Sequence, residues 1–198
     1  MSCFVLWEDK AIGPIARFGP HVFLIACVAS RMRVDRYELM SSGVIDGKPC
    51  GGNANVFREL QRGPLWDAVT HVVAVLDTDE IHDRLSGIKA RRTIADTAYQ
   101  QWSDSVASEV RKQAPEVRHS QLEICFLDRN LETLLSLIGE GMPQLASALG
   151  KRRLDRDKIL QRAAGDERSL RSACAEMPSW DHLVATVTRV VAGAHGSR

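Results

Sequence analysis

Residues 69–80 have the sequence VTHVVAVLDTDE, and this stretch decides the fold class of the chain. Its first eight residues are nearly all β-branched or apolar, which is typical of a strand buried on both faces of a parallel sheet. The strand is expected to end on Asp77, Thr78 and Asp79. Because successive side chains of a strand point in opposite directions, Asp77 and Asp79 share one side and place two carboxylates at the strand tip.

Two further apolar stretches repeat this organisation. Residues 3–7 (CFVLW) precede Glu8, and residues 121–127 (QLEICFL) precede Asp128. A fourth strand is predicted over residues 34–42, and segments with a helical spacing of apolar residues lie between the strands. This alternation predicts an α/β fold with a parallel or mixed sheet flanked by helices. The predicted helices are a broken one before Pro20 and others over residues 20–32, 53–61, 90–113, 131–138 and 179–192.

The length of 198 residues predicts one domain. We expect an α/β core over residues 1–138 and a helical C-terminal extension, residues 139–198, packed on it. Lys plus Arg exceed Asp plus Glu by 26 − 25 = 1, so bulk charge singles out no class of partner. The longest apolar run, residues 21–29, fits a helix or a buried strand but is too short for the roughly 20 residues of a membrane span. Five singly scattered cysteines are typical of reduced thiols in a cytoplasmic protein.

Acidic residues follow three of the predicted strands: Glu8, Asp77, Asp79 and Asp128. In open α/β sheets, ligands bind beyond the carboxyl ends of the strands. Carboxylates that converge there repel one another unless a cation is present, and Mg²⁺ or Mn²⁺ prefers such oxygen ligands. A site of this kind supports phosphoryl transfer. Acids after a strand are also commonly solvated loop residues or helix caps, and that alternative stays open.

The order of three motifs resembles the Toprim domain shared by topoisomerases, DnaG-type primases and OLD-type (overcoming lysogenization defect) nucleases. In that family a glutamate closes the first strand, a glycine-rich turn precedes a helix, and a DxD pair closes a later strand. Glu8 matches the glutamate, and Gly51 and Gly52 match the turn. Asp77 and Asp79 match the DxD pair. The resemblance implies that Glu8 is a metal ligand or a general acid or base, and that the two aspartates bind Mg²⁺ or Mn²⁺.

This resemblance covers roughly residues 3–135, and Asp9 stands where the family commonly has a glycine. The C-terminal third resembles small stand-alone Toprim-like proteins of bacterial genomes, which include proteins associated with anti-phage defence and with ATPase partners. The features that carry this are Leu131-Glu132, the basic run KRRLDRDKIL and Pro178-Ser179-Trp180. In that setting Glu132 is a further catalytic acid. Its alternative is an acid in the first turn of a helix, stabilised by the helix dipole.

Basic residues and glycines are the candidates for contact with nucleic acid. The basic run begins at Lys151, and its phosphate-binding candidates are Lys151, Arg152, Arg153 and Lys158. The Gly51–Gly52 turn offers backbone N–H groups before a helix, as phosphate-binding loops do. Interleaved aspartates keep open the alternative that the basic run is a solvated helix face, and the turn is alternatively a plain helix cap.

Taken together, these residues predict a Mg²⁺-dependent Toprim-type nuclease, or a related phosphoryl-transfer enzyme, acting on DNA or RNA. One alternative is a catalytically silent Toprim-fold subunit that docks on an ATPase or another protein. A second is a haloacid-dehalogenase-like phosphatase in which Asp77 is the nucleophile, although this leaves Glu8 without a role. The chain has no P-loop, no GxSxG and no histidine or cysteine spacing of a zinc site, so those classes are disfavoured.

Overall fold

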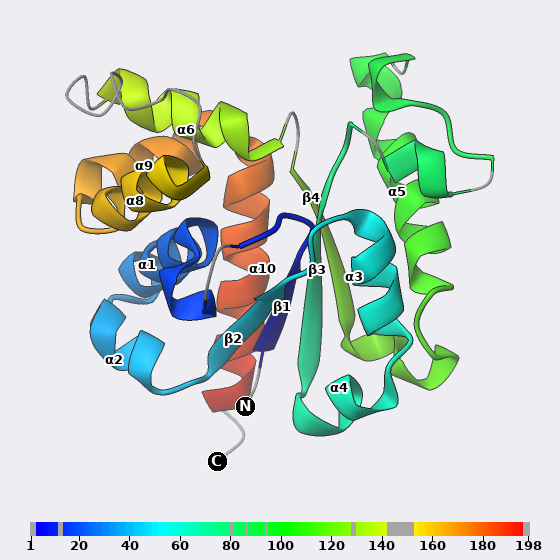
Figure 1. Ribbon diagram of the computed structural model, residues 1–198, viewed down its shortest axis with the longest axis horizontal. Coiled ribbons are helices and arrows are strands. Elements are labelled where there is room, and N and C mark those ends of the chain that lie inside the picture. Colours follow the sequence, from blue (N-terminus) through cyan, green and yellow to red (C-terminus); the bar gives the residue numbers. More distant parts are fainter. Residues whose placement is uncertain are drawn as a thin grey trace.

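The computed structural model describes residues 3–11, 14–79, 81–85, 87–93, 95–127, 130–141 and 153–195. These residues form a four-stranded sheet with the order β2-β1-β3-β4, in which every pair of neighbours is parallel. Figure 1 shows the sheet between two groups of helices. The predicted α/β class and the sheet flanked by helices are therefore confirmed, and the sheet is parallel. The strands are β1 (Cys3–Trp7), β2 (Ile45–Pro49), β3 (His71–Asp77) and β4 (Leu122–Leu127).

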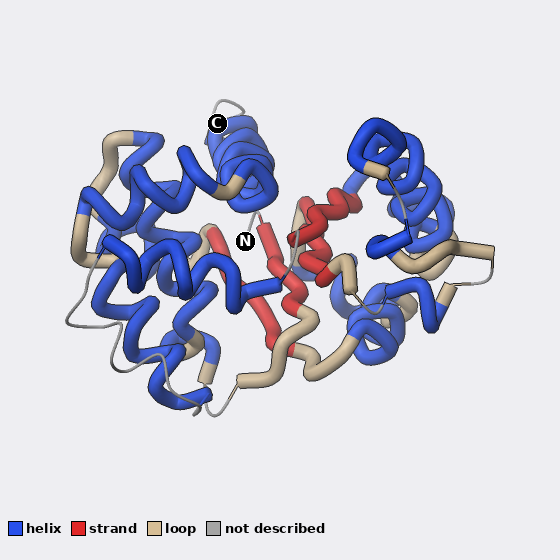
Figure 2. Tube along the Cα trace, turned by 90° about the horizontal axis from the view of Figure 1, so that it is seen from above, coloured by secondary structure: helices blue, strands red, loops and turns tan. Residues whose placement is uncertain are grey.

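Each face of the sheet has its own hydrophobic core, and the view from above separates the two groups of helices (Figure 2). One core is built with α1 (Gly19–Met32), α2 (Arg36–Ser41), α6 (Asn130–Gly141), α8 (Arg153–Ala163), α9 (Glu167–Glu176) and α10 (Pro178–His195). The other is built with α3 (Asn53–Leu60), α4 (Gly63–Ala68) and α5 (Tyr99–Arg111). Short 3₁₀ helices are η1 (Ile15–Arg17), η2 (Ile81–Arg84), η3 (Arg91–Thr93), η4 (Asp96–Ala98) and η5 (Glu116–Gln121).

Strand β3 explains why the stretch at residues 69–76 is so continuously apolar. Val73 and Val75 belong to the core beneath α1 and α10, whereas Ala74 and Leu76 belong to the core beneath α3 and α5. All four side chains are buried. Because β3 lies between β1 and β4 and is covered on both faces, no position along it faces solvent until the strand ends at Asp77.

The strand predicted over residues 34–42 is wrong, because this segment is helix α2. The carboxylate of Asp35 accepts hydrogen bonds from the N–H groups of Tyr37 at 2.8 Å and Glu38 at 2.9 Å, which is a helix N-cap. The second strand is instead β2, between this helix and the Gly51–Gly52 turn. Its sequence IDGKP contains three poor strand formers, and it is a strand because it pairs along its length with β1.

Most of the predicted helices are confirmed, with one shortened. Residues 21–29 lie in α1, so the strand alternative for them is wrong. The helix predicted over residues 90–113 begins only at Tyr99, after two 3₁₀ turns. Its apolar face is as expected, with Trp102, Val106 and Val110 buried against the sheet.

The C-terminal part of the chain is helical, as predicted, and it packs on the sheet. Helix α10 contacts β4, β1 and β3, while α8 and α9 lie against α1. Helix α6 runs through residue 138, and the division into a core and an extension at that residue stays a prediction. In the part of the chain that the structure describes, no helix is both long and apolar enough to cross a membrane.

Candidate functional site

Glu8 and Asp77 meet at the carboxyl edge of the sheet. Strands β1 and β3 are neighbours in parallel register, with Trp7 opposite Val75, so both chains end side by side. The N–H of Glu8 donates to the carbonyl of Val75 at 3.1 Å and continues the ladder by one residue. The Glu8 side chain then reaches across to β3, where its Oε2 accepts a hydrogen bond from the backbone N–H of Asp77 at 2.8 Å. Both residues are half-buried.

The Gly51–Gly52 turn is fastened to the same edge. The N–H of Gly51 donates to the carbonyl of Asp9 at 2.9 Å, and the N–H of Gly52 donates to the carbonyl of Glu8. From the first turn of α3, the side-chain amide of Asn55 donates to the Cys50 carbonyl at 2.9 Å and to the Gly51 carbonyl at 3.2 Å. The turn therefore holds the backbone that carries Glu8.

This turn requires glycine at both positions. Gly51 has φ +75° and Gly52 has φ +123°, a region of backbone conformation that residues with a Cβ rarely adopt. Gly52 is also the N-cap residue of α3, which begins at Asn53, and no side chain caps this end. The two glycines predicted from the sequence thus have a conformational reason to be glycine, and their predicted contact with nucleic acid stays a prediction.

Residues 77–79, at the end of β3, differ in exposure. Thr78 is fully buried, Asp77 is half-buried and Asp79 is exposed. The N–H of Thr78 donates to the carbonyl of Leu127 at 3.3 Å, which ties the tip of β3 to the tip of β4. The buried Thr78 hydroxyl has no hydrogen-bond partner in the described part of the chain. Of these three residues, only the threonine between the two aspartates is fully buried, and the direction of the two carboxylates stays a prediction.

Several predicted site residues lie outside the described part of the chain. Asp128, Lys151 and Arg152 are among them. Glu132 is in the first turn of α6 and Arg153 is the first residue of α8, but their side chains are not among those described. Lys158 is described and is exposed on α8. The structure thus brings together Glu8, the glycine turn and the DxD segment.

The carboxylate oxygens at this edge are ligands of the kind that a hard cation prefers. Magnesium is commonly held by one or two carboxylates together with water and substrate phosphates. Glu8 and Asp77 are two such carboxylates on adjoining strand ends. Within the described ranges, no group of three or more histidine, cysteine, aspartate or glutamate side chains is arranged to hold a metal ion. The predicted Mg²⁺ or Mn²⁺ site therefore stays a prediction.

Lys10 is a residue of this edge that the sequence did not single out. It is exposed two residues after Glu8, and the aliphatic part of its side chain lies over the glycine turn. Three of its side-chain carbons are 3.4–3.7 Å from the position that a Cβ on Gly51 would occupy. Lys10 thus lies against the turn that holds the backbone of Glu8. The one signal for it in the sequence is its place directly after the strand-closing acids.

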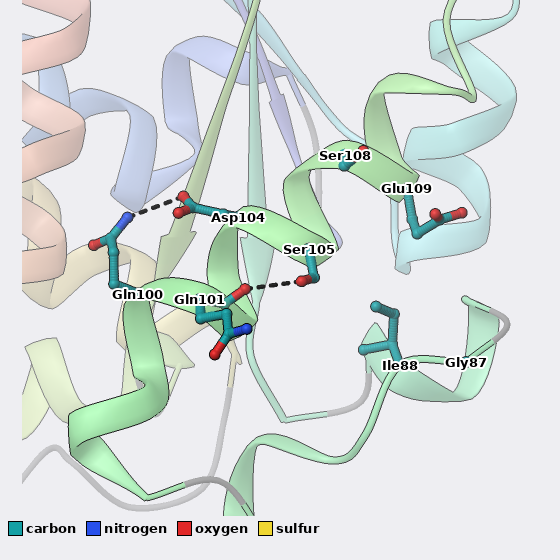
Figure 3. Close-up of a pocket in the computed structure, with 8 residues that line it drawn as sticks. All are labelled: Gly87, Ile88, Gln100, Gln101, Asp104, Ser105, Ser108 and Glu109. Atoms are coloured by element: carbon teal, nitrogen blue, oxygen red, sulfur yellow. Dashed lines mark hydrogen bonds between the residues drawn. The ribbon is translucent and has the colours of Figure 1, made fainter.

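A separate open cavity of about 730 Å³ lies on the outer face of α5, and it contains none of the predicted site residues. Figure 3 shows that it is lined mostly by polar side chains of α5 together with Gly87 and Ile88. Its polar groups bond within the helix: Gln100 donates to Asp104 at 3.0 Å, and Ser105 donates to the Gln101 carbonyl at 2.8 Å. This surface is therefore a solvated helix face and not part of the carboxylate edge.

No family model matches the chain, and no curated protein sequence matches it. The chain is similar to two solved structures of the C-terminal region of the OLD protein of Xanthomonas campestris pv. campestris, each at 13% identity. For the structure phased with platinum, the match covers 98% of this chain and 95% of that one, with a TM-score of 0.42. For the structure phased with iodine, the figures are 98%, 97% and 0.43.

Proposed function

We propose that the protein is a Toprim-type, metal-dependent nuclease or a related phosphoryl-transfer enzyme acting on nucleic acid. The observation that carries this proposal is the hydrogen bond of 2.8 Å from the N–H of Asp77 to the carboxylate of Glu8. Glu8, the glycine turn and the DxD segment are far apart in the sequence, yet they adjoin one another at the carboxyl ends of β1, β2 and β3. Ligand sites of open α/β sheets lie at this edge.

Each residue has a distinct task in this proposal. Asp77 and Asp79 would hold Mg²⁺ or Mn²⁺, with Asp128 as a further ligand. The metal would polarise the phosphate and neutralise the leaving oxygen. Glu8 would hold the metal or move a proton, and Glu132 would be a further acid at the site.

The haloacid-dehalogenase-like alternative is less well supported. It uses Asp77 as a nucleophile and gives Glu8 no task, although the Glu8 carboxylate is bonded to the backbone of Asp77 itself. It also gives no reason for the two positive-φ glycines whose N–H groups bond to the carbonyls of Glu8 and Asp9. Trapping of a beryllium fluoride adduct on Asp77 would support this alternative.

The test is calorimetric titration of Mg²⁺ and Mn²⁺ into the wild-type protein and into an Asp77→Asn/Asp79→Asn variant. Wild type is expected to bind the metal and the variant to lose that binding, because two of its oxygen ligands lose their charge. Glu116→Gln, an exposed acid on η5, is the matched control and should bind metal as wild type does. Cleavage of single- and double-stranded DNA and RNA is then assayed with the same three proteins.

Two results would contradict the proposal. The first is cleavage by Asp77→Asn/Asp79→Asn at the wild-type rate. The second is a wild-type protein that neither binds metal, with or without added oligonucleotide, nor cleaves any substrate. The second result would favour the alternative of a silent binding subunit that docks on an ATPase or another protein.

A further inference from the structure

A cleft of about 840 Å³ lies beside β4, on the side of the sheet away from β1. Figure 1 shows β4 between α5 and α10, and residues of both helices form the walls of the cleft. Ile124 and Phe126 of β4 line it as well. The volume is within the usual range of ligand-binding clefts. The other lining residues are Tyr99, Gln100, Ser103, Asp104, Ala107, Arg111, Thr133, Glu176, Met177, Pro178, Ser179 and His182.

The backbone of β4 faces this cleft with unpaired groups. In a parallel sheet, the N–H and C=O groups of one residue point to the same side, and the next residue points to the other. The Leu127 carbonyl accepts from Thr78, so Leu127 and Cys125 face β3. Ile124 and Phe126 therefore direct their N–H and C=O groups outward. Within the described residues nothing pairs with this outer edge, since β4 is the last strand in the order.

The walls of the cleft carry no excess of positive charge. Their charged side chains are Arg111, Asp104 and Glu176, one basic and two acidic. Binding of a nucleic-acid backbone depends on lysine and arginine side chains that neutralise successive phosphates, and this cleft has no such excess. Its floor is apolar, with Phe126 and the buried Met177. These features favour a neutral, partly apolar ligand over a polyanion.

The edge of β4 is recessed between two helices. If a second copy of this protein paired its own β4 with this edge, its α5 and α10 would meet the same walls of the cleft. The edge strand of a second folded copy therefore does not fit. A single extended chain brings no helices of its own and adds only one strand beside β4, about 4.8 Å away. Unpaired edge strands bind such segments through main-chain hydrogen bonds, and the neighbouring side chains select the sequence.

We propose that the outer edge of β4 binds an extended peptide segment of a partner protein as a fifth strand of the sheet. The segment has apolar side chains at alternate positions, which pack against Phe126 and Ala107. The side chains between them are polar and face Ser179 and His182. Its main chain bonds to the outward N–H and C=O groups of Ile124 and Phe126. This inference does not rest on the proposed nuclease activity, because it involves none of the carboxylates at the strand tips.

The probe is a set of short linear peptides selected from a random displayed library against the full chain. Binding is measured by fluorescence anisotropy, and amide hydrogen exchange is followed by NMR. A bound peptide is expected to slow exchange at Ile124 and Phe126. Ala107→Arg on one wall and His182→Trp on the other should each weaken binding about tenfold or more. Ser105→Arg is the matched control, because Ser105 is two residues before Ala107 on α5, about 200° around the helix, and lines the other cavity but not this cleft. It should change binding less than about twofold.

Three results would overturn the proposal. One is failure of the library to yield any peptide that prefers wild type over Ala107→Arg. Another is a selected peptide that leaves exchange at Ile124 and Phe126 unchanged. The third is protection of these two amides by a short oligothymidylate, which would assign the cleft to nucleic acid. His182 is exposed, so His182→Trp carries the test if Ala107→Arg, at a half-buried position, fails to fold.

Discussion

Trp7 and Glu8 are adjacent in the sequence and lie in two regions of opposite character. Trp7 is fully buried, and its ring is stacked with Trp180 at a centroid distance of 6.4 Å. Glu8 is half-buried at the carboxyl edge and bonds to the tip of β3. One step along the chain thus separates an aromatic core, defined here as Trp7, Phe18, Phe23 and Trp180, from the carboxylate edge. Trp7, the last residue of β1, thus packs in the core, whereas Glu8, the next residue, lies at the edge where the proposed site would be.

The largest effect on stability is expected in the aromatic core. Trp180→Ala should lower the free energy of unfolding by about 3–5 kcal/mol, because it removes a fully buried ring that contacts both Trp7 and Phe23. Urea denaturation followed by circular dichroism measures the change. Val117→Ala, at a side chain that is 84% exposed, should change it by less than about 0.5 kcal/mol. Equal effects of the two substitutions would show that Trp180 does not stabilise the fold.

His21 makes the stability of the same core depend on pH. Burial lowers the pKa of His21 from 6.5 to about 4, against a smaller opposite effect of Asp46. Its Nδ1 accepts a hydrogen bond of 3.3 Å from the indole N–H of Trp7, so the imidazole is neutral. Between these two pKa values the unfolded chain binds a proton that the folded chain does not. Stability is therefore lost as the pH falls from 6.5 towards 4, and below that value the loss is complete.

The size of this loss is on the order of 3 kcal/mol, from about 1.4 kcal/mol for each unit of pKa difference. Urea denaturation of wild type and His21→Gln at several pH values measures it. Glutamine keeps an acceptor for the Trp7 indole and does not titrate, so the difference between the two proteins should shrink or reverse as the pH falls. A difference that stays constant from pH 7 to pH 4 would contradict the prediction.

The glycine turn connects the two regions, and its effect on stability is intermediate. Gly52→Ala should cost about 1–3 kcal/mol, because φ +123° is strained for any residue with a Cβ although no atom obstructs the added carbon. The N–H of Gly52 bonds to the Glu8 carbonyl, so metal binding should weaken as well. Gly43→Ala is the matched control, since Gly43 has φ +64° and open space around it. Gly43→Ala should lower the free energy of unfolding without changing metal binding. Weaker metal binding in Gly43→Ala but not in Gly52→Ala would show that the turn does not support the site.

The sequence predicts the strands that are buried on both faces and misses the one that is not. Strands β1, β3 and β4 are largely apolar because alternate side chains of each strand enter the two cores. Strands β2 and β4 both lie at edges of the sheet, but β2 contains Asp46, Gly47 and Pro49, so its strand conformation depends on pairing with β1, which no local pattern reveals.

The sequence predicts which residues belong to the candidate site better than it predicts how those residues are arranged. Glu8, Gly51 and Asp77 follow from the order of motifs, but the contact of Glu8 with Asp77 requires that β1 and β3 be neighbours. That order is set by the packing of helices on the two faces, which involves residues far apart in the chain. Lys10 was missed because a lone exposed lysine has no pattern to distinguish it from a solvated one.

The smallest effect on stability, and the largest on activity, is expected at Asp77. Its contact with Glu8 uses the backbone N–H, which Asp77→Asn retains, so the free energy of unfolding should change by less than about 0.5 kcal/mol. In the absence of metal, loss of one of two neighbouring negative charges should slightly stabilise the protein. Metal binding and cleavage should nevertheless be lost in the same variant. If Asp77→Asn lowered the free energy of unfolding as much as Trp180→Ala does, Asp77 would be a structural residue. Trp7 and Glu8 would then differ only in how deeply they are buried.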